Sequence, residues 1–533
     1  MRTWRLTTTT ALVAGCALVL AACGGDDDDG SGGGGDGPEP TSDTPLIVGT
    51  TDTVTNIDPA GQYDNPSRNI VVNVYQRLLT VPLGETEPAP EAAESCDWDD
   101  ETTYTCILKE GQMFSDGEEV TAENVVHSIE RNLEIQHETG GWELLSGIES
   151  VEAVDDYTVT FQLSGPDATF PFVLTTAAAA IVPMSYPADE LQPNEEVIGS
   201  GPYTVEAFDP SQQIQLGLNE NYSGDYELNN GSVIQQYYDQ ESALKQAIEE
   251  GEVMVAYRNL GVTDIEDLEQ NGADRGVEVV RGEGVEINYM VFQVGREPFD
   301  ELAIRQAIAH IVDRESIAEN VYRGTVTPLY GPVPDGVAGH VTTFEQEYGA
   351  EPDVAAAEQL LEDAGIDTPV SFDLWWMPDR YGAEIADMYG EIERQLEDTG
   401  LFDVTLEQLS WAQYSTTFSD GSMDAFDLGW FPDHPDPSNY IAPFYHSENN
   451  FLQNGYENQE MDDLIDTILT DLDQEERIAA VEEASVIAAQ DVPVLHLWQR
   501  DQVAAVREGV TGMQETLDPS FTLYYNLVSG VEE

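Results

Sequence analysis

Positively charged side chains are scarce in this chain of 533 residues. It has 19 lysines and arginines against 103 aspartates and glutamates, for a net charge of −84, and its only lysines are Lys109 and Lys245. A surface this negative repels phosphate groups, which excludes nucleic acid and anionic lipid headgroups as partners. The acidic residues are spread along the whole chain, which indicates adaptation to salty surroundings, where charges are strongly screened.

Cysteine is also rare, with four residues, of which Cys96 and Cys106 lie in the body of the chain. They bracket the short segment Asp97–Thr105. In an oxidising compartment, a pair of cysteines at the spacing of a hairpin predicts a disulfide. A zinc site is the weaker alternative because no histidine lies nearby.

Long apolar runs are missing except at the N-terminus. There, Arg2 and Arg5 precede an apolar run over 11–22, and residues 20–23 read Leu-Ala-Ala-Cys. This order is that of a secretory signal, and the run is shorter than the roughly 20 residues that span a bilayer. We therefore predict that residues 1–22 are removed as a signal peptide.

The end of this signal resembles the bacterial lipobox, in which the cysteine is lipidated and becomes the new N-terminus. The resemblance implies that Cys23 anchors the protein to the outer face of the cell membrane. An ordinary signal cut near a cysteine is the alternative. Residues 23–45 are rich in glycine and aspartate, which predicts a flexible tether, and folded material is expected from Leu46.

Motifs of several enzyme classes are absent. The chain has no G-x-S-x-G nucleophile elbow, no lysine after a glycine as in a P-loop, and no H-E-x-x-H zinc motif. The seven histidines are scattered singly. We therefore predict a protein that is not an enzyme and has no cofactor or metal, and an extracellular hydrolase is the disfavoured alternative.

The body alternates strand-like and helix-like patterns, which favours an α/β fold, and its size favours two or more lobes. Strands are predicted over 157–163 and 214–218, and a strand–turn–strand over 277–294 with its turn at 282–284. Helices are predicted with these bounds and caps: 122–132 after Thr121, 355–364 after Asp353 with Gly365 as the closing glycine, 384–398 before Gly400, and 474–490 before Pro493.

One segment of the sequence is distinctive enough to indicate a protein family. Residues 108–131 read Leu-Lys-Glu-Gly-Gln-Met-Phe-Ser-Asp-Gly-Glu-Glu-Val-Thr-Ala-Glu-Asn-Val-Val-His-Ser-Ile-Glu-Arg. A strand ending at Phe114, a turn at 115–117 and a helix capped by Thr121 are expected from this segment. It resembles the signature of the family 5 extracellular solute-binding proteins, the peptide/nickel type that feeds ABC importers.

Further blocks match the same family in the same order. Asn73–Leu79 looks like its early helix, Gly199–Tyr203 like its G-[TS]-G-P-Y turn, and Phe299–Arg314 like the long helix that opens its second lobe. Leu428–Tyr440 and Pro493–Leu497 match late in the chain. The resemblance covers the chain from about residue 46 to its end. Within the family, the sequence most resembles the actinobacterial peptide-binding lipoproteins.

The resemblance implies a class II periplasmic-binding-protein fold, an α/β architecture of two lobes built on largely parallel sheets. It places the first lobe at 46–283, with an inserted subdomain at about 82–194 that holds the cysteine pair. The second lobe follows at 284–502, and residues 503–533 return to the first lobe. The ligand is expected in the cleft between the lobes, and the protein is expected to act as a monomer.

The family also implies site residues. In its peptide-binding members an aspartate shortly after a tryptophan binds the peptide α-ammonium, which puts Asp433 in that role. The other interpretation of Asp433 is a turn residue in a proline-rich loop, and Asp436 is the near alternative for the ligand role. An arginine that holds the peptide carboxylate corresponds to Arg380, for which a structural ion pair is the other interpretation. Trp376, Trp411 and Trp430 are candidates to line the cleft, and core packing is their alternative role.

These features predict a lipid-anchored receptor that captures di- or oligopeptides and delivers them to an ABC permease. A second hypothesis keeps the scaffold and replaces the peptide with an oligosaccharide stacked on the tryptophans. Nickel is a weaker candidate because the histidines are scattered.

Overall fold

The computed structural model describes residues 44–530, apart from 259, 379, 449, 518 and 520. The predicted signal peptide, Cys23 and nearly all of the predicted tether lie outside the described residues. Within the described part of the chain, no helix is both long enough and apolar enough to cross a bilayer.

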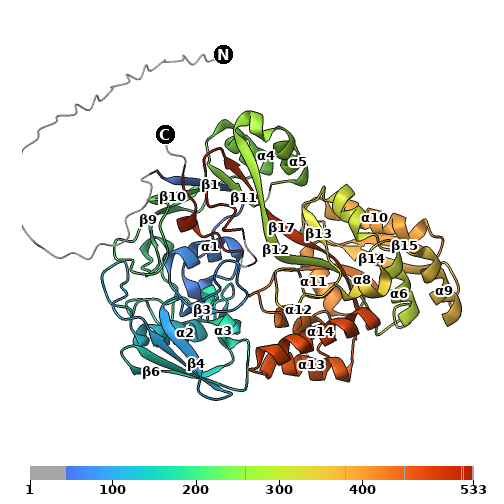
Figure 1. Cartoon of the computed structure of the whole chain (residues 1–533), viewed down its shortest axis with the longest axis horizontal. Helices are drawn as coiled ribbons and strands as arrows, with labels where there is room; N and C mark the ends of the chain where they lie inside the picture. Colours follow the sequence, from blue (N-terminus) through green and yellow to red (C-terminus); the bar gives the residue numbers. More distant parts are fainter. Residues whose placement is uncertain are drawn as a thin grey trace, which may run out of the picture. The chain divides into compact units, whose positions relative to one another are not determined.

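An 11-stranded sheet is the central element of the fold (Figure 1). Its strand order is β15-β14-β16-β12-β17-β11-β1-β10-β9-β8, and β13 pairs with β17 beside this path. The strands are β1 Leu46–Thr50, β8 Tyr203–Asp209, β9 Gln213–Leu218, β10 Ser232–Tyr237, β11 Val255–Tyr257, β12 Val277–Phe292, β13 Val326–Pro328, β14 Val370–Trp376, β15 Phe402–Gln408, β16 Ala425–Trp430 and β17 Val494–Arg507.

The expectation of largely parallel sheets is wrong. Only the pairs that β1 makes with β10 and β11, and that β14 makes with β15 and β16, are parallel among the described strands of this sheet. The long strands β12 and β17 run antiparallel to each other, and β8, β9 and β10 form an antiparallel meander. Short connections such as the one between β8 and β9 can join only antiparallel neighbours, since a parallel pair needs a crossover.

Hydrophobic cores on the two halves of this sheet define two lobes. In the first lobe, Val48, Ile70 and Val233 belong to one core, which α1 (Asn65–Val74) covers. Helices α4 (Glu241–Glu250) and α5 (Val262–Asn271) also belong to this lobe. The long strands β12 and β17 run side by side from this lobe into the second (Figure 1).

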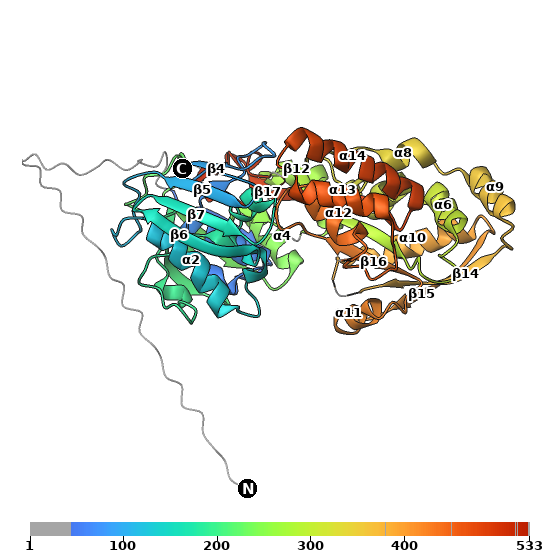
Figure 2. The same cartoon turned by 90° about the horizontal axis from the view of Figure 1, so that it is seen from below.

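The second lobe contains most of the helices, around cores that include Phe292, Ile308 and Phe426. Its helices are α6 Leu302–Ile311, α7 Arg314–Ser316, α8 Thr343–Tyr348, α9 Val354–Ala364, α10 Ile385–Glu397, α11 Trp411–Ser419, α12 Ser438–Tyr445, α13 Gln459–Thr470 and α14 Gln474–Asp491. Helices α12, α13 and α14 lie together on one side of this lobe (Figure 2).

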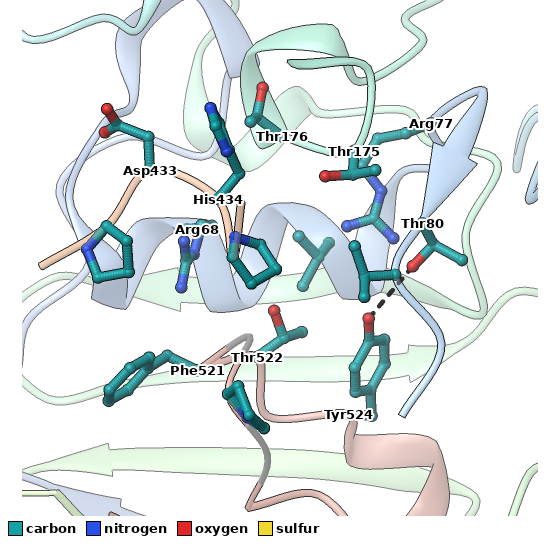
Figure 3. A pocket seen from close by; sticks show the side chains of 15 residues that line it. Arg68, Arg77, Thr80, Thr175, Thr176, Asp433, His434, Phe521, Thr522 and Tyr524 are labelled. Carbon is teal, nitrogen blue, oxygen red and sulfur yellow. Dashed lines mark hydrogen bonds between the residues drawn. The ribbon is translucent and has the colours of Figure 1, made fainter. Parts of the chain in front are cut away.

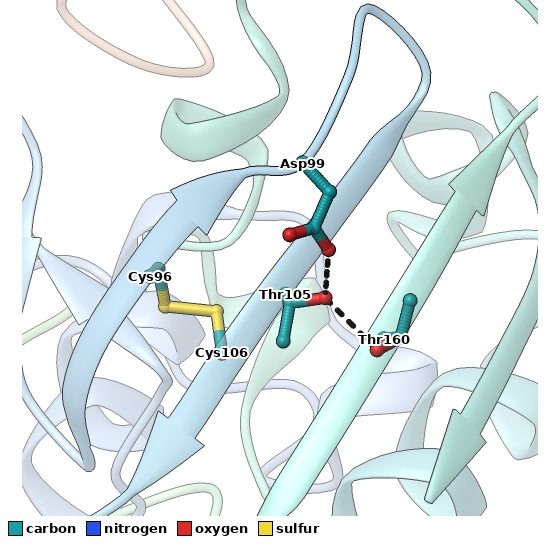
Figure 4. The surroundings of a disulfide bond; sticks show 5 residues. All are labelled: Cys96, Asp99, Thr105, Cys106 and Thr160. Carbon is teal, nitrogen blue, oxygen red and sulfur yellow. Dashed lines mark hydrogen bonds between the residues drawn. A yellow bond between two sulfur atoms is a disulfide. The ribbon is translucent and has the colours of Figure 1, made fainter. Parts of the chain in front are cut away.

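A separate four-stranded antiparallel sheet, in the order β4-β5-β7-β6, packs against α2 (Ala122–Ile135) with a core of its own. Its strands are β4 Ala93–Trp98, β5 Thr103–Leu108, β6 Ile148–Asp155 and β7 Thr158–Leu163, and the short elements β2 Leu79–Thr80, β3 Ala89–Pro90 and α3 Phe170–Val173 flank it. Cys96 and Cys106 face each other across β4 and β5 and form the predicted disulfide (Figure 4).

The predicted turn at 282–284 is wrong, because residues 277–292 form the single strand β12. The register between β12 and β17 shifts between Gly282 and Glu286, so the strand has an irregularity there instead of reversing. A Cβ atom on Gly282 would lie 2.0 Å from the carbonyl oxygen of Leu517, and one on Gly284 would lie 2.1 Å from that of Arg500. These glycines therefore permit close backbone approach within a strand, which the sequence pattern cannot distinguish from a turn.

Local signals were the more reliable part of the prediction. Asp353 caps α9 by accepting from the backbone of Ala356, and Gly365 closes the helix at φ 70°. Thr121 starts α2 in a capping box with Asn124. Three expectations are wrong in their bounds. No strand ends at Phe114, since β5 ends at Leu108. Of the early helix expected at 73–79, only 73–74 are helical, at the end of α1, and the long helix expected at 299–314 is shortened to α6, Leu302–Ile311.

Candidate ligand-binding site

One cavity lies between the two lobes and has a volume of about 360 Å³. We call it the aromatic cavity. Its lining includes Tyr63 and Arg68 from the first lobe, and Tyr381, Trp411, Trp430, Phe431 and Phe451 from the second. Its charged groups include Arg380 and Asp433. With Asp64 and Arg68, the cavity therefore combines apolar walls with two acidic and two basic side chains, a combination typical of sites for small organic ligands.

Four of the five predicted ligand-binding residues line this cavity together: Arg380, Trp411, Trp430 and Asp433. They come from β16, from α11 and from two loops, so only the fold brings them into one place. Trp376, at the end of β14, is not part of this lining and packs against the hydrophobic core that contains Phe372.

Asp433 follows β16 in a loop that Asn439 organises. The Oδ1 atom of Asn439 accepts from the indole Nε1 of Trp430 at 2.9 Å and from the backbone N–H of Asp433 at 3.3 Å. The hydroxyl of Tyr63, from the other lobe, donates to Oδ1 of Asp433. The carboxylate therefore already attracts a hydrogen-bond donor across the cleft.

Asp436, the near alternative, has a structural role. Its side chain is fully buried and accepts from Nη2 of Arg477 at 2.8 and 2.9 Å and from the backbone N–H of Ser438 at 2.8 Å. A buried ion pair of this kind is costly to break, because the remaining charge loses its partner. Asp436 is therefore committed to Arg477 and unavailable to a ligand.

Arg380 stacks on an aromatic face. Its guanidinium carbon lies 4.0 Å from the ring centroid of Trp411 and 5.7 Å from that of Tyr381. No ion pair joins Arg380 to a carboxylate within the described residues. At 4.0 Å the guanidinium makes a cation–π contact with the indole of Trp411. The predicted alternative of a structural ion pair finds no support in this arrangement.

Sequence analysis missed two arginines of the first lobe. Arg68 and Arg258 lie 5.9 and 5.7 Å from the ring centroid of Phe431, which belongs to the second lobe. Burial, and next the like charge of Arg258, lower the pKa of Arg68. Arg258 pairs with Asp52 at 3.0 Å and has a left-handed backbone with φ 67°. The scarcity of basic residues was the signal that could have drawn attention to both.

Two further cavities adjoin the aromatic cavity. The small cavity, of about 40 Å³, shares Arg68 and Asp433 with it and also contains Arg77, His434 and Tyr524 (Figure 3). The charged cavity, of about 270 Å³, shares Arg380 and Tyr381 with it. Its other charged lining residues are Glu241, Arg258, Glu286, Glu384, Arg500 and Asp501. Among the described residues, no group of three or more histidine, cysteine or acidic side chains could hold a metal ion.

Comparison with known proteins identifies the family. The model of the bacterial extracellular solute-binding proteins, family 5 (middle region), matches residues 87–451. The chain belongs to this family. This membership confirms the resemblance predicted from the sequence, and with it a solute-binding protein rather than an enzyme.

Curated relatives are similar over most of their length. The dipeptide-binding protein of Escherichia coli K12 is 26% identical over 491 residues, which cover 86% of this chain and 89% of the relative. Heme-binding protein A of Haemophilus influenzae is 27% identical over 461 residues, with coverages of 79% and 81%.

Solved structures confirm the fold. The periplasmic binding protein DppA of Helicobacter pylori, in complex with the peptide STSA, has a TM-score of 0.72 at 23% identity and covers 92% of this chain and 98% of its own. HbpA2 of Haemophilus parasuis has a TM-score of 0.80 at 21% identity, with coverages of 91% and 99%. The two-lobed class II periplasmic-binding-protein fold is therefore the fold of this chain.

Proposed function

We propose that this protein captures peptides in the aromatic cavity and delivers them to the permease of an ABC importer. The observation that carries the proposal is that Asp433 and Arg380 line the same cavity, which lies between the two lobes. A peptide with free termini carries an ammonium and a carboxylate, so the two side chains complement its two ends. Relatives named as dipeptide-binding proteins support the same ligand class.

In this proposal each lining residue has a chemical role. Asp433 accepts hydrogen bonds from the ligand ammonium and from Tyr63, while Arg380 binds the carboxylate of a short peptide. The indoles of Trp411 and Trp430 offer apolar area to side chains. Because Asp433 and Arg380 come from the second lobe and Tyr63 comes from the first, closure of the lobes would exclude water from the ammonium and strengthen its electrostatic attraction to Asp433.

An oligosaccharide fits the tryptophans less well. Sugar rings stack on open aromatic faces, but Arg380 lies over Trp411 at 4.0 Å. Around Trp430, Phe444 and Phe451 pack edge-to-face at centroid distances of 5.1 and 5.7 Å. Both indoles therefore have aromatic or cationic neighbours where a sugar would need space.

The proposal includes the attachment and organisation of the protein. Lipidated Cys23 would hold a monomer on the outer face of the cell membrane, with residues 23–45 as a tether. The first lobe would comprise residues 46–283, with an inserted subdomain at about 82–194. The second lobe would comprise residues 284–502, and residues 503–533 would return to the first lobe. The irregularity in β12 between Gly282 and Glu286 supports the first of these interlobe boundaries.

The experiment is isothermal titration calorimetry of the mature chain, at high salt, against four ligand classes. These are peptides with free termini, cello- and malto-oligosaccharides, haemin and nickel ions. The proposal is supported if peptides bind and the sugars, haemin and nickel ions do not. Binding of any other class without peptides would replace it.

A further inference from the structure

The charged cavity continues the aromatic cavity. Arg380 and Tyr381 line both, so the two spaces meet at these two residues. Their volumes, about 360 and 270 Å³, are comparable, and each is close to the lower limit of ordinary ligand pockets. A ligand that passes Arg380 would therefore find a second space almost as large as the first.

Both lobes also enclose the charged cavity. Glu241, at the start of α4, and Arg258, after β11, contribute from the first lobe, and Thr325 and Glu384 contribute from the second. Arg500 lies on β17, one of the two strands that connect the lobes. The same closure that covers a ligand in the aromatic cavity would cover its continuation here.

The lining of the two cavities differs in chemistry. Aromatic rings dominate the first, whereas charged groups of both signs dominate the second. In the charged cavity, Arg258 lies 3.0 Å from Asp52, and Arg500 lies 3.4 Å from Glu286. One carboxylate uses at most two of the five N–H donors of a guanidinium, so each arginine can donate to a further oxygen of a ligand.

Positive charge is concentrated around these cavities. Outside the predicted signal peptide the chain has 17 basic residues, from 19 minus Arg2 and Arg5. Four of these, Arg68, Arg258, Arg380 and Arg500, line the two cavities. The charged cavity also has four acidic lining residues, Glu241, Glu286, Glu384 and Asp501, so its net charge does not attract an anion, and the negative end of a ligand would have to contact the arginines directly.

We propose that the ligand is a peptide of about four residues or more, which extends from the aromatic cavity past Arg380 into the charged cavity. This inference rests on the proposed function and adds the length of the ligand. The N-terminal residues of the peptide lie against the aromatic rings and Asp433. Arg380 donates to a backbone carbonyl of the peptide in place of its terminal carboxylate. The terminal carboxylate lies near Arg258 and Arg500. Because an extended chain advances about 3.3–3.6 Å per residue, a dipeptide leaves the charged cavity to water.

The test is calorimetry of the mature chain against alanine peptides of two to six residues with free termini. Affinity should rise about tenfold or more between two and four residues. Ala383 is exposed and lines the charged cavity, so Ala383→Trp fills that space without touching the core. The variant should bind the dipeptide as the native protein does and lose the gain with length.

The control is Ala355→Trp, which makes the same substitution at an exposed position of α9 that lines neither cavity. It should leave the whole series unchanged. Equal affinities of the native protein for di- and tetrapeptides would overturn this inference alone, as would an equal loss at every length in Ala383→Trp. Failure of every peptide to bind would overturn the proposed function as well.

Discussion

The side chains of Asn288 and Asp427 meet inside the second lobe, where Nδ2 of Asn288 donates to Oδ1 of Asp427 at 2.8 Å. The hydroxyl of Tyr389 donates to the same oxygen at 2.9 Å. The other two oxygens of the pair, Oδ1 of Asn288 and Oδ2 of Asp427, are buried acceptors without a donor among the described residues. A proton on the Asp427 carboxyl group would supply the donor that this pair lacks, and burial raises the pKa of Asp427 to about 7.

This pKa predicts a dependence of stability on pH. The pKa of Asp427 is raised on folding from 3.8 to about 7. The stabilising contribution of the protonated Asp427 to the free energy of unfolding is therefore fully present below pH 4 and is lost as the pH rises through 7. The loss should reach roughly 4 kcal/mol above pH 7. In Asp427→Asn the amide cannot ionise, so the variant should gain stability relative to the native protein between pH 5 and 8. Urea denaturation at constant high salt measures the difference, and parallel pH profiles would contradict the prediction.

The disulfide should contribute measurably to stability. Cys96 and Cys106 are 10 positions apart, and a loop of that length predicts about 2–3 kcal/mol. The neighbouring contacts, from Thr105 to Asp99 at 2.7 Å and to Thr160 at 2.9 Å, do not involve the sulfur atoms and should persist (Figure 4). The double variant Cys96→Ala, Cys106→Ala should therefore unfold at lower denaturant with unchanged ligand affinity. Labelling of either thiol in the unreduced native protein would show that the bond is absent.

Salt should stabilise the protein strongly. Arginine and lysine side chains are shared between acids, as where Lys245 lies 3.1 Å from Asp264 and 2.8 Å from Asp267, but most carboxylates have no such partner available, given the ratio of 19 to 103. Their mutual repulsion is screened as the Debye length falls from about 10 Å at 0.1 M to 3 Å at 1 M. The melting temperature should rise steeply between about 0.05 and 1 M salt. A melting temperature independent of salt would show that the charges are balanced locally.

How far the sequence predicted the structure depended on the range of the interactions. The caps of α9 at Asp353 and Gly365 follow from contacts within one turn, and they were predicted correctly. The irregularity at Gly282 was mistaken for a turn, because the deciding neighbour, Leu517, is distant in sequence. The contact between Tyr63 and Asp433 joins residues 370 positions apart, and no pattern within either segment could indicate it.

Attachment to the membrane can be tested at Cys23. If the cysteine carries diacylglycerol, Cys23→Ser should release the protein into the medium or leave it unprocessed. Fractionation followed by mass spectrometry of the mature N-terminus distinguishes the two results. Ser31→Ala, within the predicted tether, is the matched control and should stay with the membrane. A correctly processed Cys23→Ser variant in the membrane fraction would exclude lipid anchoring at this residue.

The ligand ammonium provides the sharpest test of Asp433. Removal of its charge leaves a desolvated cation without a counter-ion, which typically costs about 2–5 kcal/mol, or on the order of 30- to several-thousand-fold in affinity. Asp433→Asn should therefore nearly abolish binding of peptides with free amino groups. N-acetylated peptides should bind the native protein poorly, because acetylation removes the charge that Asp433 would bind.

Two control variants separate this effect from general ones. Tyr63→Phe removes only the neutral hydroxyl that donates to Asp433, and its cost should be about 0.5–1.5 kcal/mol. Asp300→Asn removes a charge at an exposed position that lines none of the three cavities, and it should leave affinity unchanged. Calorimetry of the native protein and the three variants against free and acetylated peptides gives all the comparisons. Equal affinity of the native protein for both peptide sets would remove Asp433 from the site, since a carboxylate that contacts the ammonium must distinguish a charged amine from an amide.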